Sequence, residues 1–185
     1  MSDIYLWWIG ADAADDAMLR EVRSHVEEAF ARRVRFWRGP QRPVDAFDPR
    51  RQQHSSTRIL RWLLTTRPAE AHKTLAITDA DLFIPILTFV FGEAQLDGHA
   101  AVVSTARLGE GLGPMTPVRV LTARLVKECV HELGHTFGLI HCTRPRCVMS
   151  RSVNVNDVDA KAVALCQDCR TRYLELEERG TKAHD

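Results

Sequence analysis

The sequence has 185 residues, of which 45% are hydrophobic and 26% are charged, a composition that supports one compact domain and hardly two. The formal net charge of +1 and the isoelectric point near 7.7 give no indication of a nucleic-acid partner, an anionic membrane or a strongly acidic substrate. The start, "MSDIYLWWIG", lacks a basic segment, and its apolar run is too short for a signal peptide or a membrane span. We therefore expect a cytoplasmic protein; a monomer is a separate expectation.

The first 80 residues alternate between strand and helix patterns. "IYLWWIG" reads as a buried strand, residues 15–32 as an amphipathic helix, and "RVRFWR" as a half-buried strand. Residues 39–49 are a proline-rich loop, "SSTRILRWLLTTR" is a Ser-capped helix, and "KTLAITD" is a third strand. The apolar faces of the two helices are Met18, Leu19, Val22, Val26 and Phe30 in the first, and Ile59, Leu60, Leu63 and Leu64 in the second. This order predicts an α/β fold with a largely parallel sheet.

The second half of the chain predicts an antiparallel pair, a long helix and a thin tail. "TFVFGEAQ" and "HAAVVST" are two strands joined by a short turn, which places one of them at the sheet edge. Thr116 as N-cap and Pro117 as first helical residue begin a helix through "VRVLTARLVKECVHELGHTFG". Beyond Met149 large apolar residues become few, and "NVNDVDAKAVALCQDC" and "RTRYLELEE" predict two short helices. Such a tail needs something other than a core to hold it.

A metal-binding pattern lies at the end of the long helix, in "HELGHTFGLIH". His131 and His135 are four residues apart, so both rings face one side of the helix and can occupy two vertices of a tetrahedral zinc site. Gly138 can end the helix in a left-handed conformation and return His141 as third ligand, which leaves one vertex open. Glu132 stands beside the histidines as a general base. An ordinary amphipathic helix is the alternative, and it requires helix, glycine and third histidine to coincide by chance.

Four of the five cysteines follow this motif, spaced C-x4-C and C-x2-C with 18 residues between the pairs. Four thiolates form a closed zinc site that stabilises a fold without an open vertex, so we expect a second, structural zinc on Cys142, Cys147, Cys166 and Cys169. Reactive thiols at "CQDC" and an iron–sulfur site are the alternatives. Cys129 belongs to neither pair and is expected to be a buried thiol.

The catalytic motif joined to this cysteine set resembles the archaemetzincin family of the metzincin clan of zinc metallopeptidases. The family pattern HExxHxxGxxxC-x4-C-x-M, followed by a spacer and C-x2-C, matches residues 131–149 position by position. The spacer between Met149 and Cys166 holds 16 residues, one fewer than is typical of the family, which leaves the register of the tail open. "ITDADLF", "FVFGEAQLDG" and "VVSTARL" are also similar to the family.

The resemblance implies a compact metzincin-like α/β domain. Its sheet would be mixed, with five mostly parallel strands and an antiparallel edge strand. The domain would consist of an α/β subdomain (1–141), which ends in the active-site helix and the third histidine, and a small helical subdomain (142–185) held by the cysteine-bound zinc. Met149 would form the methionine turn beneath the metal. Residues 89–95 would be the edge strand above the cleft, where an extended peptide pairs, with Gly92 at a bulge or a close backbone approach.

The expected function is that of a zinc metallopeptidase with two zinc ions and a peptide or protein substrate, in which Glu132 is the general base. Whether it cleaves internally or at chain ends stays open. The alternative is a peptide-binding protein that keeps the zinc cleft with little or no turnover, whereas a purely structural two-zinc module leaves Glu132 without a role. Asp79 and Asp81 are expected to cap a turn and stand outside the site.

Overall fold

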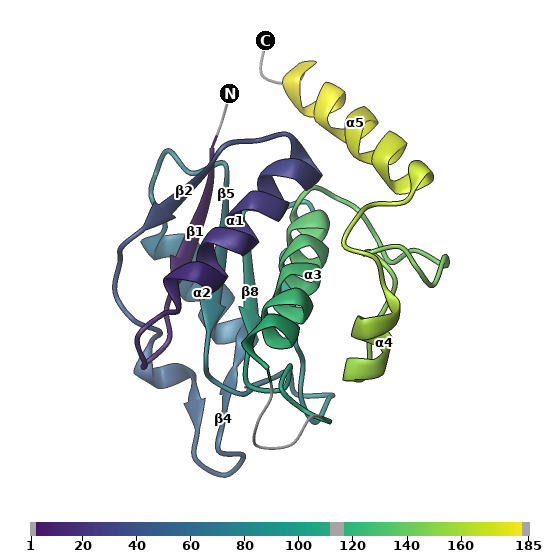
Figure 1. The fold of residues 1–185 in the computed structure, drawn as a ribbon. Coiled ribbons are helices and arrows are strands. Elements are labelled where there is room, and N and C mark those ends of the chain that lie inside the picture. The colour runs from purple at the N-terminus through teal and green to yellow at the C-terminus, as the bar shows by residue number, and fades with distance from the viewer. Residues whose placement is uncertain (1–2, 112–116, 183–185) are drawn as a thin grey trace.

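The computed structural model describes residues 3–111 and 117–182 and shows an α/β domain built on a five-stranded sheet (Figure 1). The strand order is β2-β1-β5-β8-β7, and four strands run parallel while β7 is antiparallel at the edge. The strands of this sheet are β1 (Ile4–Trp8), β2 (Val34–Trp37), β5 (Lys73–Thr78), β7 (Gly92–Ala94) and β8 (Ala100–Ser104). A second, small sheet contains β3 (Phe47–Asp48), β4 (Gln53–Ser55) and β6 (Leu82–Phe83). The predicted fold class is confirmed.

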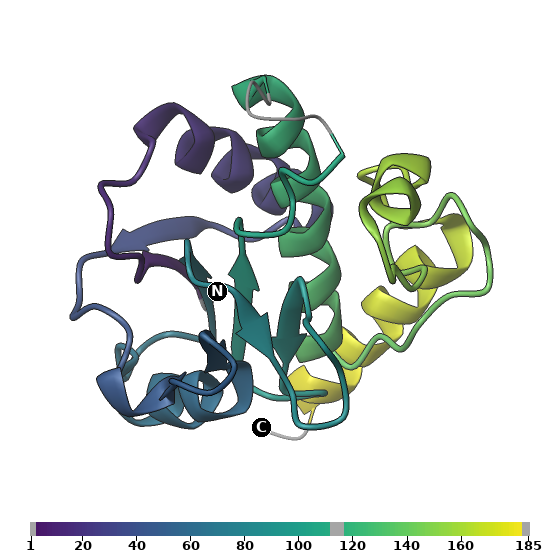
Figure 2. The same ribbon diagram turned by 90° about the horizontal axis from the view of Figure 1, so that it is seen from below.

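Helices cover both faces of the large sheet, as Figures 1 and 2 show. Helices α1 (Asp16–Phe30) and α3 (Val118–Thr136) lie on one face and α2 (Ser56–Thr66) on the other. Alternate residues of β1 divide between the two cores, with Leu6 packed on the α1 and α3 side and Trp7 on the α2 side. The central strand β5 is therefore buried along its whole length, which accounts for the unbroken "KTLAIT" run.

The first two helices form for the local reasons that the sequence indicates. Asp15 caps α1 by accepting hydrogen bonds from two backbone N–H groups, and Ser55 caps α2 by accepting one, from Arg58 N–H. Two apolar residues are more exposed than an apolar helix face and a half-buried strand would suggest. Leu64 is 37% exposed because it lies at the margin of the apolar stripe of α2, and Phe36 is 42% exposed because β2 is an edge strand.

Two boundaries in the middle of the chain differ from expectation. The strand expected over residues 88–95 is reduced to β7, because Val90 pairs with Leu82 of the small sheet instead of continuing along β8. Pro117 occupies the N-cap position of α3 and not its first helical position, and Thr116 lies outside the described residues. The expected loop at residues 39–49 contains a short 3-10 helix, η1 (Val44–Ala46), and β3.

The tail contains two helices with other limits than predicted, α4 (Val155–Ala160) and α5 (Gln167–Lys182). Asn154 and Asp157 form a capping box that begins α4, and the extended backbone of Lys161 ends it after six residues. The second cysteine pair therefore belongs to the start of α5, not to the first tail helix. Helix α4 lies beside α3, and α5 reaches the C-terminal end of α1, where Tyr173 contacts Phe30 (Figure 1).

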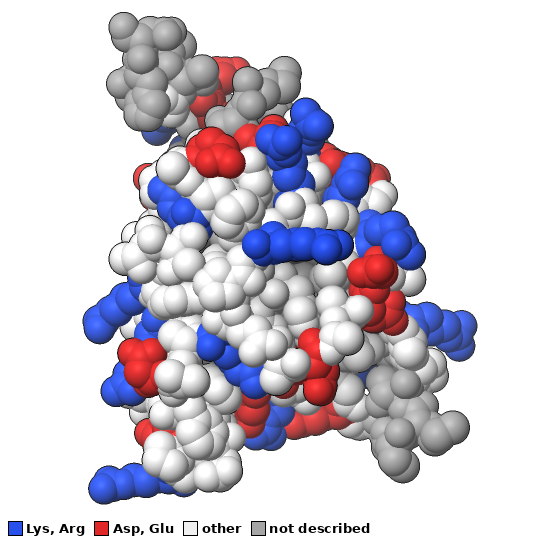
Figure 3. Space-filling view, turned by 90° about the vertical axis from the view of Figure 1, so that its left-hand side faces the viewer, with Lys and Arg blue, Asp and Glu red and all other residues white. Residues whose placement is uncertain are grey.

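The surface carries mixed charge. On the face shown in Figure 3, Lys and Arg side chains alternate with Asp and Glu and with uncharged surface, and basic side chains do not gather into one continuous patch there. None of the described helices combines the length and the apolar composition needed to cross a membrane.

Candidate active site

The structure brings His131, His135 and His141 together at the end of α3. The first two project from its last turns, and Gly138, with φ of 86°, turns the chain so that His141 returns to them. One ring nitrogen from each residue lies within 4.8 Å of the others. The left-handed glycine is thus in the conformation expected of it.

The hydrogen bonds of the rings determine which nitrogens face the centre of this group. Nδ1 of His131 lies 2.8 Å from the carbonyl oxygen of Val148, and Nδ1 of His135 lies 2.7 Å from that of Leu139. A carbonyl oxygen can only accept, so each Nδ1 donates and each Nε2 is left with a lone pair. Burial lowers the pKa of both rings, which keeps them neutral.

The spacing of the lone pairs fits zinc. The two Nε2 atoms are 3.1 Å apart. Two nitrogens on a tetrahedral zinc, each about 2.0 to 2.1 Å from the metal, are separated by about 3.3 Å. Burial, followed by the charge of Arg151, lowers the pKa of His141, so this third imidazole is also available as a neutral ligand.

Glu132 lies beside the histidines and is buried, yet it lines the cleft in front of them. Burial, followed by the charge of Glu128, raises the pKa of Glu132 well above its usual range. A Cβ atom on Gly92 would lie 2.7 Å from Cγ of Glu132 and 2.7 Å from the carbonyl oxygen of Val102. The glycine of the edge strand therefore marks a close approach to the carboxylate, one of the two roles expected for it.

Met149 is fully buried against α3 at Gly134, between the two helical histidines. A Cβ atom on Gly134 would lie 2.4 Å from the sulfur of Met149, so the side chain fits only because this helical residue is glycine. The backbone N–H of Cys142 donates to the carbonyl oxygen of Met149 over 2.9 Å, which fixes the turn. Gly134 was not singled out from sequence, although its place inside "HELGH" was the available signal.

A cleft of about 480 Å³ opens in front of the histidines. One wall is the rim from Leu87 to Gly92, and the other is the turn from Arg151 to Val153. A second hollow of about 300 Å³ lies at the other end of the histidine group and is lined by Ala94, Leu96 and Ile140. Leu96 and Ile140 are 56% and 70% exposed, so this end of the site presents apolar surface.

A buried ion pair lies directly behind the site. Nζ of Lys161 is 3.0 Å from a carboxylate oxygen of Glu128 and 3.5 Å from Nδ1 of His131. Burial raises the pKa of Glu128, and the charge of Lys161 opposes that shift. The sequence analysis missed both residues, because they are 33 positions apart and only the fold joins them. Glu128, one helical turn before Glu132, was the visible signal.

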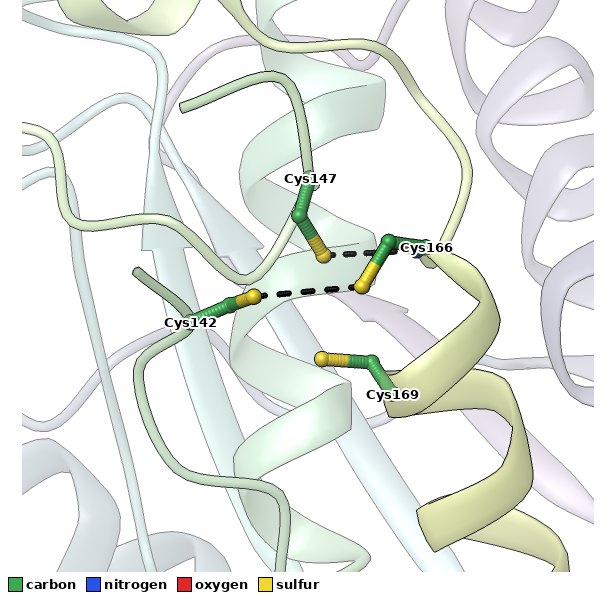
Figure 4. A group of neighbouring side chains, drawn as sticks. All are labelled: Cys142, Cys147, Cys166 and Cys169. Atoms are coloured by element: carbon green, nitrogen blue, oxygen red, sulfur yellow. Dashed lines mark hydrogen bonds between the residues drawn. The ribbon is translucent and has the colours of Figure 1, made fainter. Parts of the chain in front are cut away.

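The four cysteines form a second group, drawn in Figure 4. Cys142 and Cys147 come from the loop after α3, and Cys166 and Cys169 from the start of α5. All four sulfurs lie within 4.8 Å of one another, and those of Cys142 and Cys166 are 3.8 Å apart. Sulfurs about 2.3 Å from a tetrahedral zinc have nearly this separation, so the group fits zinc.

The surroundings of the sulfurs favour a thiolate at Cys166, whereas burial raises the pKa of Cys147 and Cys169. Backbone N–H groups of Arg144 and Cys166 donate to the sulfurs of Cys142 and Cys147. Although burial opposes the change, hydrogen bonds from the Cys169 backbone and the neighbouring thiols lower the pKa of Cys166 to about 7. Cys129 lies apart in the core, where burial raises the pKa of its thiol, as expected for a buried cysteine.

The two aspartates after β5, which were expected to cap a turn, contact segments distant in sequence. Asp79 accepts hydrogen bonds from the backbone of Ala11 and Asp12 and pairs with Arg42. Asp81 pairs with Arg107. Neither lines the cleft in front of the histidines.

This fold, with three imidazoles and a glutamate at the floor of a cleft, defines a class, the zinc metallopeptidases. The sequence profile of Peptidase family M54 matches residues 69–175. The archaemetzincin of Methanocaldococcus jannaschii is 41% identical over 139 residues, which are 75% of this chain and 74% of that relative. The chain belongs to Peptidase family M54.

Solved archaemetzincins have the same fold over nearly the whole chain. The crystal structure from Methanopyrus kandleri superposes with a TM-score of 0.83 at 31% identity and covers 96% of this chain and 97% of that one. The structure from Archaeoglobus fulgidus, complexed with malonate, gives a TM-score of 0.77 at 31% identity and covers 92% and 99%. The resemblance seen in the motif therefore extends to the architecture.

Proposed function

We propose that His131, His135 and His141 hold a catalytic zinc and that Glu132 is the general base of peptide-bond hydrolysis. The observation that carries the proposal is the convergence of the three ring nitrogens beside a carboxylate that lines the cleft. Zinc, when bound there, supplies a Lewis acid that activates water and polarises the scissile carbonyl group. Glu132 takes a proton from the attacking water and passes it to the leaving amine nitrogen as the carbon–nitrogen bond breaks.

The substrate would bind as an extended strand along β7. Phe91 and Gln95 use their backbone groups toward β8, since Ser104 N donates to Phe91 O and Gln95 N donates to Ala100 O. Backbone groups alternate between the two edges of a strand, so those of Gly92 and Ala94 face the outer edge. An antiparallel peptide is the favoured partner for such an edge, because antiparallel pairing is the more stable arrangement per residue.

This direction orders the substrate in the cleft. Strand β7 runs from the rim of the 480 Å³ cleft toward the hollow beside Leu96. In an antiparallel peptide, residues on the N-terminal side of the scissile bond would lie beside Ala94 and Leu96. Those on its C-terminal side would lie beside Phe91 and Gly92.

The four cysteines are proposed to bind a second, structural zinc, which gives two ions in all. The support is the four-sulfur geometry and the N–H groups directed at the sulfurs. A closed thiolate site has no open vertex for chemistry, so its role would be to fasten residues 142–185 as a small subdomain.

Hydrolysis of a mixed peptide library by the zinc-loaded protein, followed by mass spectrometry, tests the catalytic assignment. Glu132→Ala should keep its zinc while turnover falls by about two to four orders of magnitude, the usual effect of removing a general base. Product masses then distinguish internal from terminal cleavage. Equal product from both proteins would overturn the assignment and favour a peptide-binding protein with little turnover.

A further inference from the structure

Arg151 is an exposed arginine in the wall of the active-site cleft, two residues after Met149. Within the described ranges 3–111 and 117–182, no hydrogen bond or ion pair is found for its guanidinium group. The turn that carries it is held by other groups, since Ser150 donates its hydroxyl to Pro145 O and its backbone N–H to Cys147 O. The guanidinium group of Arg151 is therefore not needed to hold this turn in place.

Other charged side chains around the cleft have partners within the described chain. Glu128 of α3, which lines the back of the cleft, is paired with Lys161 over 3.0 Å. Arg107, which lies over the ring of Phe89, is paired with Asp81 and Glu110. Glu132 is reserved for the proton transfer proposed above. Arg151 thus supplies a positive charge that a bound molecule can neutralise. A carboxylate matches a guanidinium in both charge and geometry.

The position of Arg151 along the cleft indicates which part of a peptide it meets. It shares the 480 Å³ cleft with Phe91 and Gly92, whereas the hollow beside Leu96 and Ile140 is apolar. In the antiparallel arrangement derived above, the Arg151 end receives the residues on the C-terminal side of the scissile bond. The two ends of the site therefore differ in the chemistry that they favour.

We propose that Arg151 binds a substrate carboxylate on the C-terminal side of the scissile bond and makes the protein selective for peptides that carry one there. This inference rests on the proposed peptidase function and names its substrate class. The carboxylate has two sources, an acidic side chain or the free C-terminus of a short peptide. The second source would make the protein remove residues from C-terminal ends.

Binding to the zinc-loaded Glu132→Ala protein tests this inference without depending on turnover. The probes are matched short peptides with an apolar residue before the scissile bond, measured by calorimetry. One arm compares Asp or Glu with Asn or Gln after the scissile bond, and the other compares a free C-terminus with a C-terminal amide. We expect the carboxylate member of at least one arm to bind about tenfold more tightly, as a charge-assisted hydrogen bond allows.

Variants of Arg151 in the same Glu132→Ala background test whether this residue causes the preference for a carboxylate. Arg151→Gln should reduce the affinity ratio to about one, Arg151→Lys should retain part of it, and Arg151→Glu should reverse it. Arg119→Gln, which changes an exposed arginine in the first turn of α3 outside the cleft, should leave the ratio intact. Zinc content and circular dichroism establish that each variant is folded and loaded.

The outcomes separate this inference from the function on which it rests. The arm that shows the ratio identifies the source of the carboxylate. A ratio near one in both arms, a ratio that Arg151→Gln leaves unchanged, or no peptide binding at all overturns the role of Arg151. The catalytic proposal fails by a different result, equal hydrolysis by the wild-type and Glu132→Ala proteins.

Discussion

The histidine and cysteine groups adjoin in sequence but are supported in different ways. His131 and His135 belong to α3, whose neighbouring residues Val130 and Leu133 are fully buried in the main core. The cysteines are carried by a loop and the first turn of α5, and three of the four are only partly buried. The packing of α3 already holds the backbone of the first site, so a metal bound there would be free to serve the proposed chemistry. The second lies at the margin of the same core, where Cys147 is buried and the other three cysteines pack against it, so a metal there would add to that packing by joining the loop to α5.

Polar contacts give the tail its other attachments. Tyr173 donates its hydroxyl to Phe30 O over 2.8 Å, and Arg170 donates to Ala29 O over 2.6 Å, which join α5 to the end of α1. Arg124 of α3 pairs with Asp159 of α4. These contacts add to the apolar packing of Val155, Val158 and Tyr173 on the main core, so the removal of one polar group should have a local effect.

The largest effect should come from Cys166→Ser. Structural zinc contributes roughly 10 to 16 kcal/mol in small peptides, comparable with the total stability of about 5 to 15 kcal/mol of an ordinary domain. We expect the loss of about one equivalent of zinc, faster proteolysis beyond residue 142, and lower activity through loosening of His141 and Met149. Metal analysis and limited proteolysis of the purified protein measure these changes.

His135→Ala is the matched contrast. It should also lose about one equivalent of zinc and all measurable turnover, yet keep its resistance to proteolysis, because the core holds α3 without the metal. If Cys166→Ser kept wild-type zinc content and tail protection, the cysteines would not be a metal site. A globally unfolded His135→Ala protein would remove the distinction between the two sites.

An intermediate effect is expected from Lys161→Met, which tests whether the ion pair behind the site fastens the tail independently of the cysteines. Lys161 and Glu128 are both buried, so the substitution leaves an uncompensated carboxylate and should lower the free energy of unfolding by about 3 to 5 kcal/mol. Urea unfolding of the zinc-loaded protein measures it.

Lys127→Met is the control, since this neighbouring lysine donates to carbonyl groups of α4 from a partly exposed position and should cost about 1 kcal/mol. Adding Glu128→Gln to Lys161→Met should restore part of the loss. Equal losses for the two lysine variants would show that the buried pair has no special role.

The smallest effect concerns pH and the end of α3 that packs on α1. Burial, followed by the charge of Lys73, lowers the pKa of His72 from 6.5 to about 4, and its ring packs against Phe137. Between these values the unfolded chain binds the proton and the folded chain does not, so stability is lost as the pH falls from 6.5 toward 4. His72→Phe should reduce this acid-side loss by about 1 kcal/mol, allowing for the exposed part of the ring.

Urea unfolding of both proteins at several pH values checks this, and the comparison cancels the metal-site histidines that titrate in the same range. Parallel curves for the two proteins would show that His72 is not responsible. The effect should also persist in Cys166→Ser, since the ring of His72 packs on Phe137, the C-cap residue of α3, and not on the cysteine group.

Short-range patterns predicted most of the fold and the histidine group. The four-residue spacing of His131 and His135, and the need for a glycine before the chain can return, are local properties of a helix and its end. The mostly parallel sheet followed in the same way from alternating periodicities. The structure then placed the rings where that reasoning expected them.

Features that depend on distant partners could not be predicted. Glu128 acquires its role from Lys161, which lies 33 residues away. The edge strand is short because Val90 pairs with Leu82 of another sheet, and such a long-range pairing is not encoded in the local sequence. In the tail, by contrast, the sequence does contain the missing signal, a capping box at Asn154 and Asp157. This motif predicts that α4 begins after Asn154, and a separate helix, α5, then follows with the second cysteine pair at its start.

The peptide bond between His141 and Cys142 has a consequence for metal loading. Cys142 also donates its backbone N–H to Met149, so order at the cysteine group restricts the position of the third histidine. If occupation of one site favours the other, thermodynamic reciprocity requires an equal effect in the opposite direction. Under limiting zinc, molecules would then divide into empty and fully loaded populations with few half-loaded ones, and native mass spectrometry of a zinc titration would display that cooperativity directly.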